Sequence, residues 1–302
     1  MHAEPQPATL PLPGGREGAT VRLHPLLTGV ARGPDAWFHR EDGRMATLHA
    51  LDFRVPEDRK VDIPVVAFLV EHPTAGRILV DTGFHPGVAV DPKQNLGRLS
   101  TRAFAPRGMQ ASDAVPAQLR ARGIEPSEIG TVLMTHLHVD HASAMSEFPA
   151  ATFLFSREEW DAATTMSRPA FHGYVRRQFD HAFEYRTVDF ESAPYVDSVA
   201  TFGRGIDVFG DGSVRCVYTP GHTLGHMSVI VRLGGREALL AGDAIYTRRT
   251  LAEGVKPWRM EDEHLFERSL REIQIYAEQT PDALIVPGHD MDAWRELEPL
   301  YE

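Results

Sequence analysis

Short apolar runs rich in Val, Ile and Leu recur along the chain, and turn-forming Gly, Pro, Asp and Asn residues separate them. Apolar runs of about four to eight residues between turn signals predict buried β-strands. We expect strands at residues 21–30, 63–70, 77–81, 131–135, 151–156, 214–220, 226–233, 237–243 and 282–288.

Three segments have helical features instead. Residues 261–279 place apolar side chains close to a helical period, from Leu265 to Tyr276. Residues 156–164 open with a Ser, and residues 112–123 run from a Ser to a Gly, which are typical boundary residues of helices. Helices are therefore interspersed among the later strands.

The order of elements is strands first and then strands mixed with helices, and this order occurs twice. It predicts an α/β fold in which two sheets pack face to face with helices outside, in one domain over residues 21–302. Residues 1–20 contain several Pro and Gly, and we expect a flexible N-terminal tail. Residues 83–110 have no clear pattern, and a loop of this length is more often functional than idle.

The charge balance narrows the class of partner. The 302 residues include 31 Lys and Arg against 42 Asp and Glu, for a formal net charge of −11. Nucleic-acid binders and surfaces that dock on anionic lipid carry a basic footprint, so neither partner is expected. The hydrophobic content of 42% is enough for a large core.

A single cysteine, Cys216, excludes an intramolecular disulfide framework and cysteine-rich zinc or iron–sulfur sites. Apolar stretches are too short to span a membrane, and the N-terminal residues do not resemble a secretory signal. We therefore expect a cytoplasmic protein with no membrane partner.

The densest cluster of His and Asp residues follows the apolar run 132–134. His136, His138, Asp140 and His141 lie within six positions, where a strand leaves the core. Alternate residues of extended chain point the same way, so the first two imidazoles are expected to share a direction. Imidazole nitrogens and carboxylate oxygens are suitable donors for Zn²⁺ and similar ions, and this spacing favours a metal site over an exposed polar loop.

Three later positions share this placement. His222, Asp243 and His289 each follow a glycine at the end of a predicted strand. Taken singly, each is more typical of a turn. Together with the first motif they make five histidines and two aspartates, which suits two adjacent divalent ions, zinc above all, with Co, Mn or Fe also accepted.

This pattern resembles the metallo-β-lactamase fold superfamily, which carries His-x-His-x-Asp-His, then a distant His, an Asp and a final His. The resemblance spans about residues 60–292 and implies a four-layer αββα sandwich. It implies these ligands: His136, His138 and His222 for one metal ion, Asp140, His141 and His289 for the other, and Asp243 bridging both. Asp81 then resembles a residue that orients a ligand, although a turn-forming role is as well supported.

Tyr246 points to one branch of the superfamily, with an ordinary half-buried tyrosine as the alternative. The run Asp243-Ala-Ile-Tyr-Thr is similar to that of the N-acyl-homoserine lactonases, and implies a metal-dependent hydrolase that opens a lactone ring by attack of a metal-bridging hydroxide. In this interpretation the Tyr246 hydroxyl donates a hydrogen bond to the carbonyl oxygen of the lactone, and Asp140 passes a proton to the leaving alkoxide. The resemblance also suggests a homodimer.

An apolar acyl tail needs an apolar pocket. Candidates lie on the loops before and after the early predicted strands and beside the first motif. Simple packing or dimer contact explains them equally well: Trp37, Phe38, Phe84, Phe104, Met109 and Val139.

Two other functions stay open. A glyoxalase II-like thioesterase would share the metals but needs a basic pocket, for which Lys256 and Arg259 are the only obvious cations. A metal-binding protein without turnover is the alternative from another class.

Overall fold

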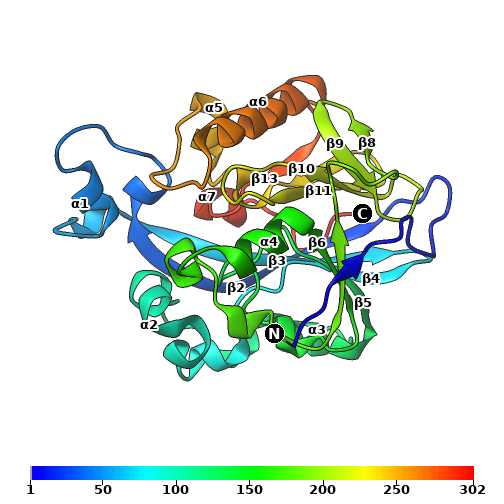
Figure 1. The fold of residues 1–302 in the computed structure, drawn as a ribbon, viewed down its shortest axis with the longest axis horizontal. Coiled ribbons are helices and arrows are strands. Elements are labelled where there is room, and N and C mark those ends of the chain that lie inside the picture. Colours follow the sequence, from blue (N-terminus) through cyan, green and yellow to red (C-terminus); the bar gives the residue numbers. More distant parts are fainter. Residues whose placement is uncertain (1) are drawn as a thin grey trace.

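The structure, a computed structural model, describes residues 2–302. Its strands form two sheets that face each other (Figure 1), one of seven strands and one of six. The seven-stranded sheet contains β1 Gln6–Pro7, β2 Arg22–Pro34, β3 Lys60–His72, β4 Gly76–Val80, β5 Ile129–Leu133, β6 Thr152–Ser156 and β7 Glu184–Val188. The six-stranded sheet contains β8 Asp197–Val199, β9 Phe202–Asp207, β10 Val214–Tyr218, β11 Met227–Arg232, β12 Glu237–Leu240 and β13 Leu284–Val286.

The core lies between the two sheets, and a second apolar layer lies under the helices. On β3, Phe68 packs into the core between the sheets, whereas its neighbour Leu69 packs into the layer under the helices. Both faces of this strand are buried, which explains why the run 63–70 is continuously apolar instead of alternating.

Helices cover the outer faces of the sheets. In Figure 1, α5 and α6 lie on the six-stranded sheet, and α2, α3 and α4 lie on the side of the seven-stranded sheet. Their bounds, with those of α1 and α7, are α1 Ala46–Ala50, α2 Pro92–Phe104, α3 Val115–Ala121, α4 Arg157–Thr165, α5 Arg248–Glu253, α6 Glu263–Gln279 and α7 Met291–Arg295. The predicted α/β sandwich with helices outside is confirmed. Within residues 2–302, no helix is long and apolar enough to cross a membrane.

The N-terminal segment differs from the flexible tail we expected. Its strand β1 pairs in parallel with β7, and the Ala8 amide donates to the Thr187 carbonyl at 2.8 Å. Ala8 and Ala19 are buried. An uncovered edge strand leaves a row of backbone groups unpaired, and this segment pairs with part of the edge of β7, at Arg186 and Thr187.

Residues 83–110 are more regular than the predicted loop. They form a short 3-10 helix, Pro86–Ala89, and then α2, which Asp91 caps. Gly97 interrupts α2 with a φ of 79°, so neither half is long enough to show a helical period in the sequence. α3 also begins later than expected, after Ala114 and not at Ser112.

Candidate metal centre

The candidate ligands meet because of the direction of the strands. β4 and β5 run parallel in one sheet, and the ladder of β10 to β13 directs the C-terminal ends of β10, β12 and β13 to one edge of the other. Residues 136–141 follow β5, His222 follows β10, Asp243 follows β12 and His289 follows β13. The two sheets therefore bring all seven predicted side chains to one place.

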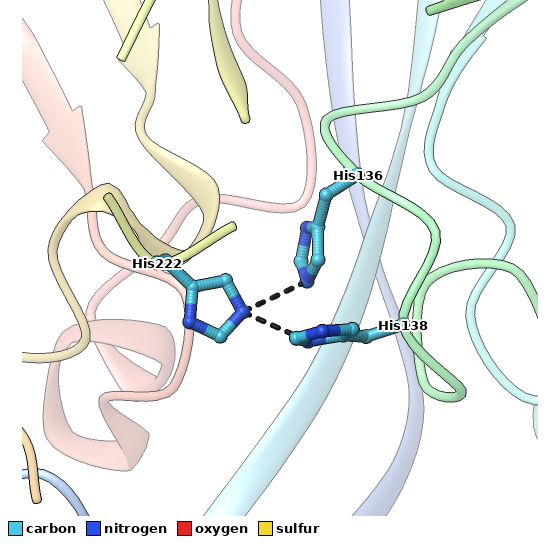
Figure 2. Close-up of side chains that lie close together, drawn as sticks. All are labelled: His136, His138 and His222. Atoms are coloured by element: carbon cyan, nitrogen blue, oxygen red, sulfur yellow. Dashed lines mark hydrogen bonds between the residues drawn. The ribbon is translucent and has the colours of Figure 1, made fainter. Parts of the chain in front are cut away.

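The first group consists of three imidazoles. Figure 2 shows His136 and His138, on the loop after β5, pointing toward His222. His222 Nε2 lies 3.2 Å from His136 Nε2 and 2.9 Å from His138 Nδ1. Donors bound to one tetrahedral zinc ion at 2.0–2.1 Å lie about 3.3 Å apart, so these separations fit one ion.

The second group lies next to the first. Asp140 Oδ2 is 3.4 Å from both His141 Nε2 and His289 Nε2. Asp243 faces both groups, because its Oδ2 lies 3.2 Å from His222 Nε2 and its Oδ1 lies 3.3 Å from His289 Nε2. One carboxylate shared between two clusters of donors is the arrangement that a bridging ligand requires.

The protonation states of the first group and of Asp243 also fit a cation. Burial lowers the pKa of His136 and His222 well below the usual range, and that of His138 to about 4, so neutral imidazoles face one another. Burial would raise the pKa of Asp243, but the surrounding histidines hold it well below its usual range. His141 Nε2 and Asp243 Oδ1 are buried without a hydrogen-bond partner among the described residues. A metal ion satisfies buried nitrogen and oxygen atoms that have no hydrogen-bond partner.

Neighbouring oxygens orient the second group. Asp81 Oδ2 lies 2.7 Å from His141 Nδ1, and the His289 Nδ1 atom lies 2.9 Å from the Pro64 carbonyl. When Nδ1 carries the hydrogen and donates it to these oxygens, the Nε2 lone pair of each ring is directed into the site. Asp81 thus makes the contact that is expected of a residue that orients a ligand. The Pro64 carbonyl was not predicted, because a backbone oxygen has no sequence signal.

His226 is close to the site but belongs to neither group. Its Nε2 accepts the Asp243 backbone N–H at 3.0 Å, and its Nδ1 lies 2.9 Å from Thr219 Oγ1. Both ring nitrogens are therefore occupied. The contact holds the turn that presents Asp243.

Tyr246 lies against His222. Its hydroxyl oxygen is 2.5 Å from His222 Nδ1. With His222 Nε2 directed into the site, Nδ1 bears the hydrogen and donates it to the phenol oxygen. The phenol hydrogen is then free for another acceptor. Burial, together with Asp243 and Asp140, raises the Tyr246 pKa well above its usual range, so the phenol stays protonated.

Aromatic rings from the connections after β2 and β4 border the centre. The Phe38 ring lies 5.1 Å from that of Tyr246 and stacks on His289 at 5.7 Å, and Phe104 meets His289 edge-on at 5.9 Å. The rings of Trp37 and Phe84 each lie 6.2 Å from that of Phe104. Val139 and Met109 pack in the same apolar cluster as Phe84. Of the predicted pocket residues, Phe38 and Phe104 thus reach the metal-site side chains directly.

Comparisons with known proteins place these features in context. The family model described as the metallo-beta-lactamase superfamily matches residues 61–289. The N-acyl homoserine lactonase AttM of Agrobacterium fabrum is 34% identical over 276 residues, which cover 91% of this chain and 95% of that protein. The N-acyl homoserine lactonase of Bacillus cereus is 25% identical, over 77% of this chain and 83% of that protein.

Solved structures share the fold. An N-acyl homoserine lactone hydrolase with N-hexanoyl-L-homoserine bound at its catalytic metal centre aligns with a TM-score of 0.73 and 22% identity, over 94% of this chain and all of that one. AidC, a dizinc quorum-quenching lactonase, aligns with a TM-score of 0.61 and 15% identity, over 93% and 90% of the two chains.

Proposed function

The chain belongs to the metallo-β-lactamase superfamily, and we propose that it is a quorum-quenching lactonase that opens the ring of N-acyl-homoserine lactones or related lactones. The observation that carries the proposal is the pair of donor groups joined by Asp243, with the Tyr246 phenol beside them. The resemblance to the AttM lactonases over nearly the whole chain supports the choice of substrate.

We assign two divalent metal ions to the centre, zinc above all. His136, His138 and His222 would hold one, Asp140, His141 and His289 the other, and Asp243 both. When bound, two such ions polarise a carbonyl and lower the pKa of water toward neutrality. The donor set contains no thiolate, so Co, Mn or Fe would also be accepted.

Side chains of the protein then stabilise the developing negative charge and transfer the proton. Hydrolysis adds water across the ester: oxygen bonds to the carbonyl carbon, the ring C–O bond breaks, and the leaving alkoxide takes a proton. Tyr246 donates its free hydrogen to the carbonyl oxygen, where negative charge develops. Asp140 holds the proton given up by the nucleophile and passes it to the alkoxide.

The aromatic side of the centre suits an apolar acyl chain. Phe38 and Phe104 present rings beside His289, and Trp37 extends the apolar surface outward from Phe104. Burying a methylene group of the substrate against such rings contributes about 0.8 kcal/mol. We therefore assign these residues, backed by Phe84 and Val139, to the acyl pocket.

The cations that a glyoxalase II-like enzyme would need are already paired. Lys256 forms ion pairs with Glu263 and with Glu267, the latter at 2.6 Å, and Arg259 faces Glu261 at 3.9 Å. These pairs leave little positive charge for the carboxylates of a glutathione thioester. The geometry accordingly favours a neutral lactone over an anionic thioester.

A substrate panel tests the proposal. The purified protein is given acyl-homoserine lactones, simple γ- and δ-lactones, S-lactoylglutathione and a chromogenic β-lactam, with and without a chelator. We expect chelator-sensitive hydrolysis of the acyl-homoserine lactones. Cleavage of the thioester alone would favour the glyoxalase II alternative, and metal binding without turnover would favour the non-catalytic one. The expected homodimer and cytoplasmic location stay predictions, which light scattering and cell fractionation can test.

A further inference from the structure

A buried carboxylate outside the proposed ligand set lies behind the first histidine group. Glu159, in the first turn of α4, is fully buried. Its Oε1 accepts the backbone N–H of Leu137 at 2.8 Å. Leu137 stands between His136 and His138, so this bond fixes the backbone from which both imidazoles project. Burying a carboxylate is costly unless its oxygens are hydrogen-bonded, which points to a purpose at this position.

The same turn of α4 also holds the loop that carries His222. Ser156 caps α4 by accepting the Glu159 N–H at 3.0 Å, and its hydroxyl donates to the Gly225 carbonyl at 2.7 Å. The contact is tight, since a Cβ atom on Gly225 would lie 2.0 Å from Glu159 N. Only a glycine allows the two backbones to approach this closely.

Tyr174 completes the connection. Its ring lies 4.9 Å from that of His138, and the two residues form an isolated β-bridge. The Tyr174 hydroxyl, the Thr223 hydroxyl and Glu159 Oε2 are all buried and lack a hydrogen-bond partner in residues 2–302. Burial raises the pKa of Glu159 to about 7, although these two hydroxyls and the Leu137 N–H lower it. Glu159 is therefore close to both hydroxyls as well as to the ligand loop.

We propose that Glu159 is a positioning residue that clamps the His136–His138 loop and the His222 loop together, so that three imidazoles converge on one metal ion. The two loops come from different sheets, and α4 contacts both from outside. The inference rests on the proposed metal site. Residues that support metal ligands in this way typically account for about 10–100-fold in metal affinity.

Three variants separate this role from general packing. Glu159→Ala removes the acceptor, Glu159→Gln keeps an amide oxygen that can accept the Leu137 N–H, and Glu158→Gln changes the neighbouring carboxylate as a matched control. Each protein is loaded with Co²⁺, and its visible absorption spectrum is recorded together with a competitive chelator titration and a thermal unfolding curve.

We expect Glu159→Ala to release one equivalent of metal about 10–100-fold more readily, with an altered Co²⁺ spectrum. Glu159→Gln should restore most of the affinity and the spectrum, and Glu158→Gln should match the wild type. If Glu159→Ala does not fold, Glu159→Asp, whose shorter side chain cannot reach Leu137, is measured instead with the same expectation.

Unchanged affinity and spectrum in the shortened variant would overturn the proposal, and so would a Glu159→Gln protein as defective as Glu159→Ala. The proposed function is judged separately, by metal content and lactone hydrolysis of the wild type. If the wild type binds metal but opens no lactone, the proposed role of Glu159 can still be tested with the same variants.

Discussion

The two sides of the proposed active site are built differently. The metal side consists of the seven candidate ligands, and the acyl side consists of Trp37, Phe38, Phe84, Phe104 and Val139. The metal side projects from strand ends of both sheets, and neighbouring oxygens fix its imidazoles, as Asp81 does for His141. The acyl side comes mostly from the connections after β2 and β4, and its members touch through ring contacts.

The difference shows where chemistry and selectivity reside. A strand end anchored in a sheet can hold a donor atom to within the tolerance of a metal bond, whereas a connection can change without disturbing the core. We therefore expect reaction type to follow the sheets and chain-length preference to follow the connections.

One polar chain fastens the acyl side to the metal side. His39 Nδ1 lies 2.7 Å from Asp35 Oδ1, and His39 Nε2 lies 2.8 Å from Thr247 Oγ1. Thr247 follows Tyr246 directly and caps α5. The segment that carries Phe38 is thus tied to the segment that carries the phenol.

The largest effect is expected from removing the shared carboxylate. Asp243→Ala should lose metal and activity together, by more than the roughly 100-fold that follows loss of a supporting residue, because both donor groups lose a ligand. Metal content and kcat/KM are the measurements. Asp292→Ala, with a side chain 84% exposed, is the control and should behave as wild type. A metal-loaded, active Asp243→Ala protein would remove the basis for the bridge.

The next largest effect separates chemistry from metal binding on the metal side. Tyr246→Phe should keep both metal ions and lower kcat by about 10²–10³-fold, since one donor to the developing oxyanion is lost. Elemental analysis and steady-state kinetics decide it. Normal kcat in this variant would show that the phenol acts only as the partner of His222.

A substitution on the acyl side should change selectivity and spare the chemistry. Phe38→Ala is expected to lower kcat/KM about tenfold for long acyl chains while changing little for a short one, because only the long chain loses apolar contact. The measurement is a series of lactones of increasing chain length with metal content held constant. Equal losses across the series would instead give Phe38 a role at the metal side.

The smallest effect concerns the tie between the two sides. His39→Ala removes hydrogen bonds that are worth about 0.5–1.5 kcal/mol each, so KM should rise severalfold with kcat nearly unchanged. His49→Ala, which removes a contact with Glu41 on the outlying α1 connection, is the control. A large fall in kcat after His39→Ala would mean that the tie positions Tyr246 and not the acyl pocket.

Much of the metal side was predictable because its signals are local. His136 to His141 lie within six positions, and a glycine before His222, Asp243 and His289 marks each strand end. Glu159 and His226 were harder to assign, because their roles depend on backbone N–H groups contributed by remote loops. Leu137 lies 22 positions from Glu159, and Asp243 lies 17 from His226.

The sequence by itself determined the layered α/β class and predicted the donors and the reaction family, because strand periodicity and ligand chemistry are properties of short segments. Only the tertiary structure decided how Asp243 divides its oxygens between two histidine groups, and that the N-terminal segment pairs with β7 instead of forming a tail. Those outcomes depend on the order and direction of strands far apart in the chain, which no short segment specifies.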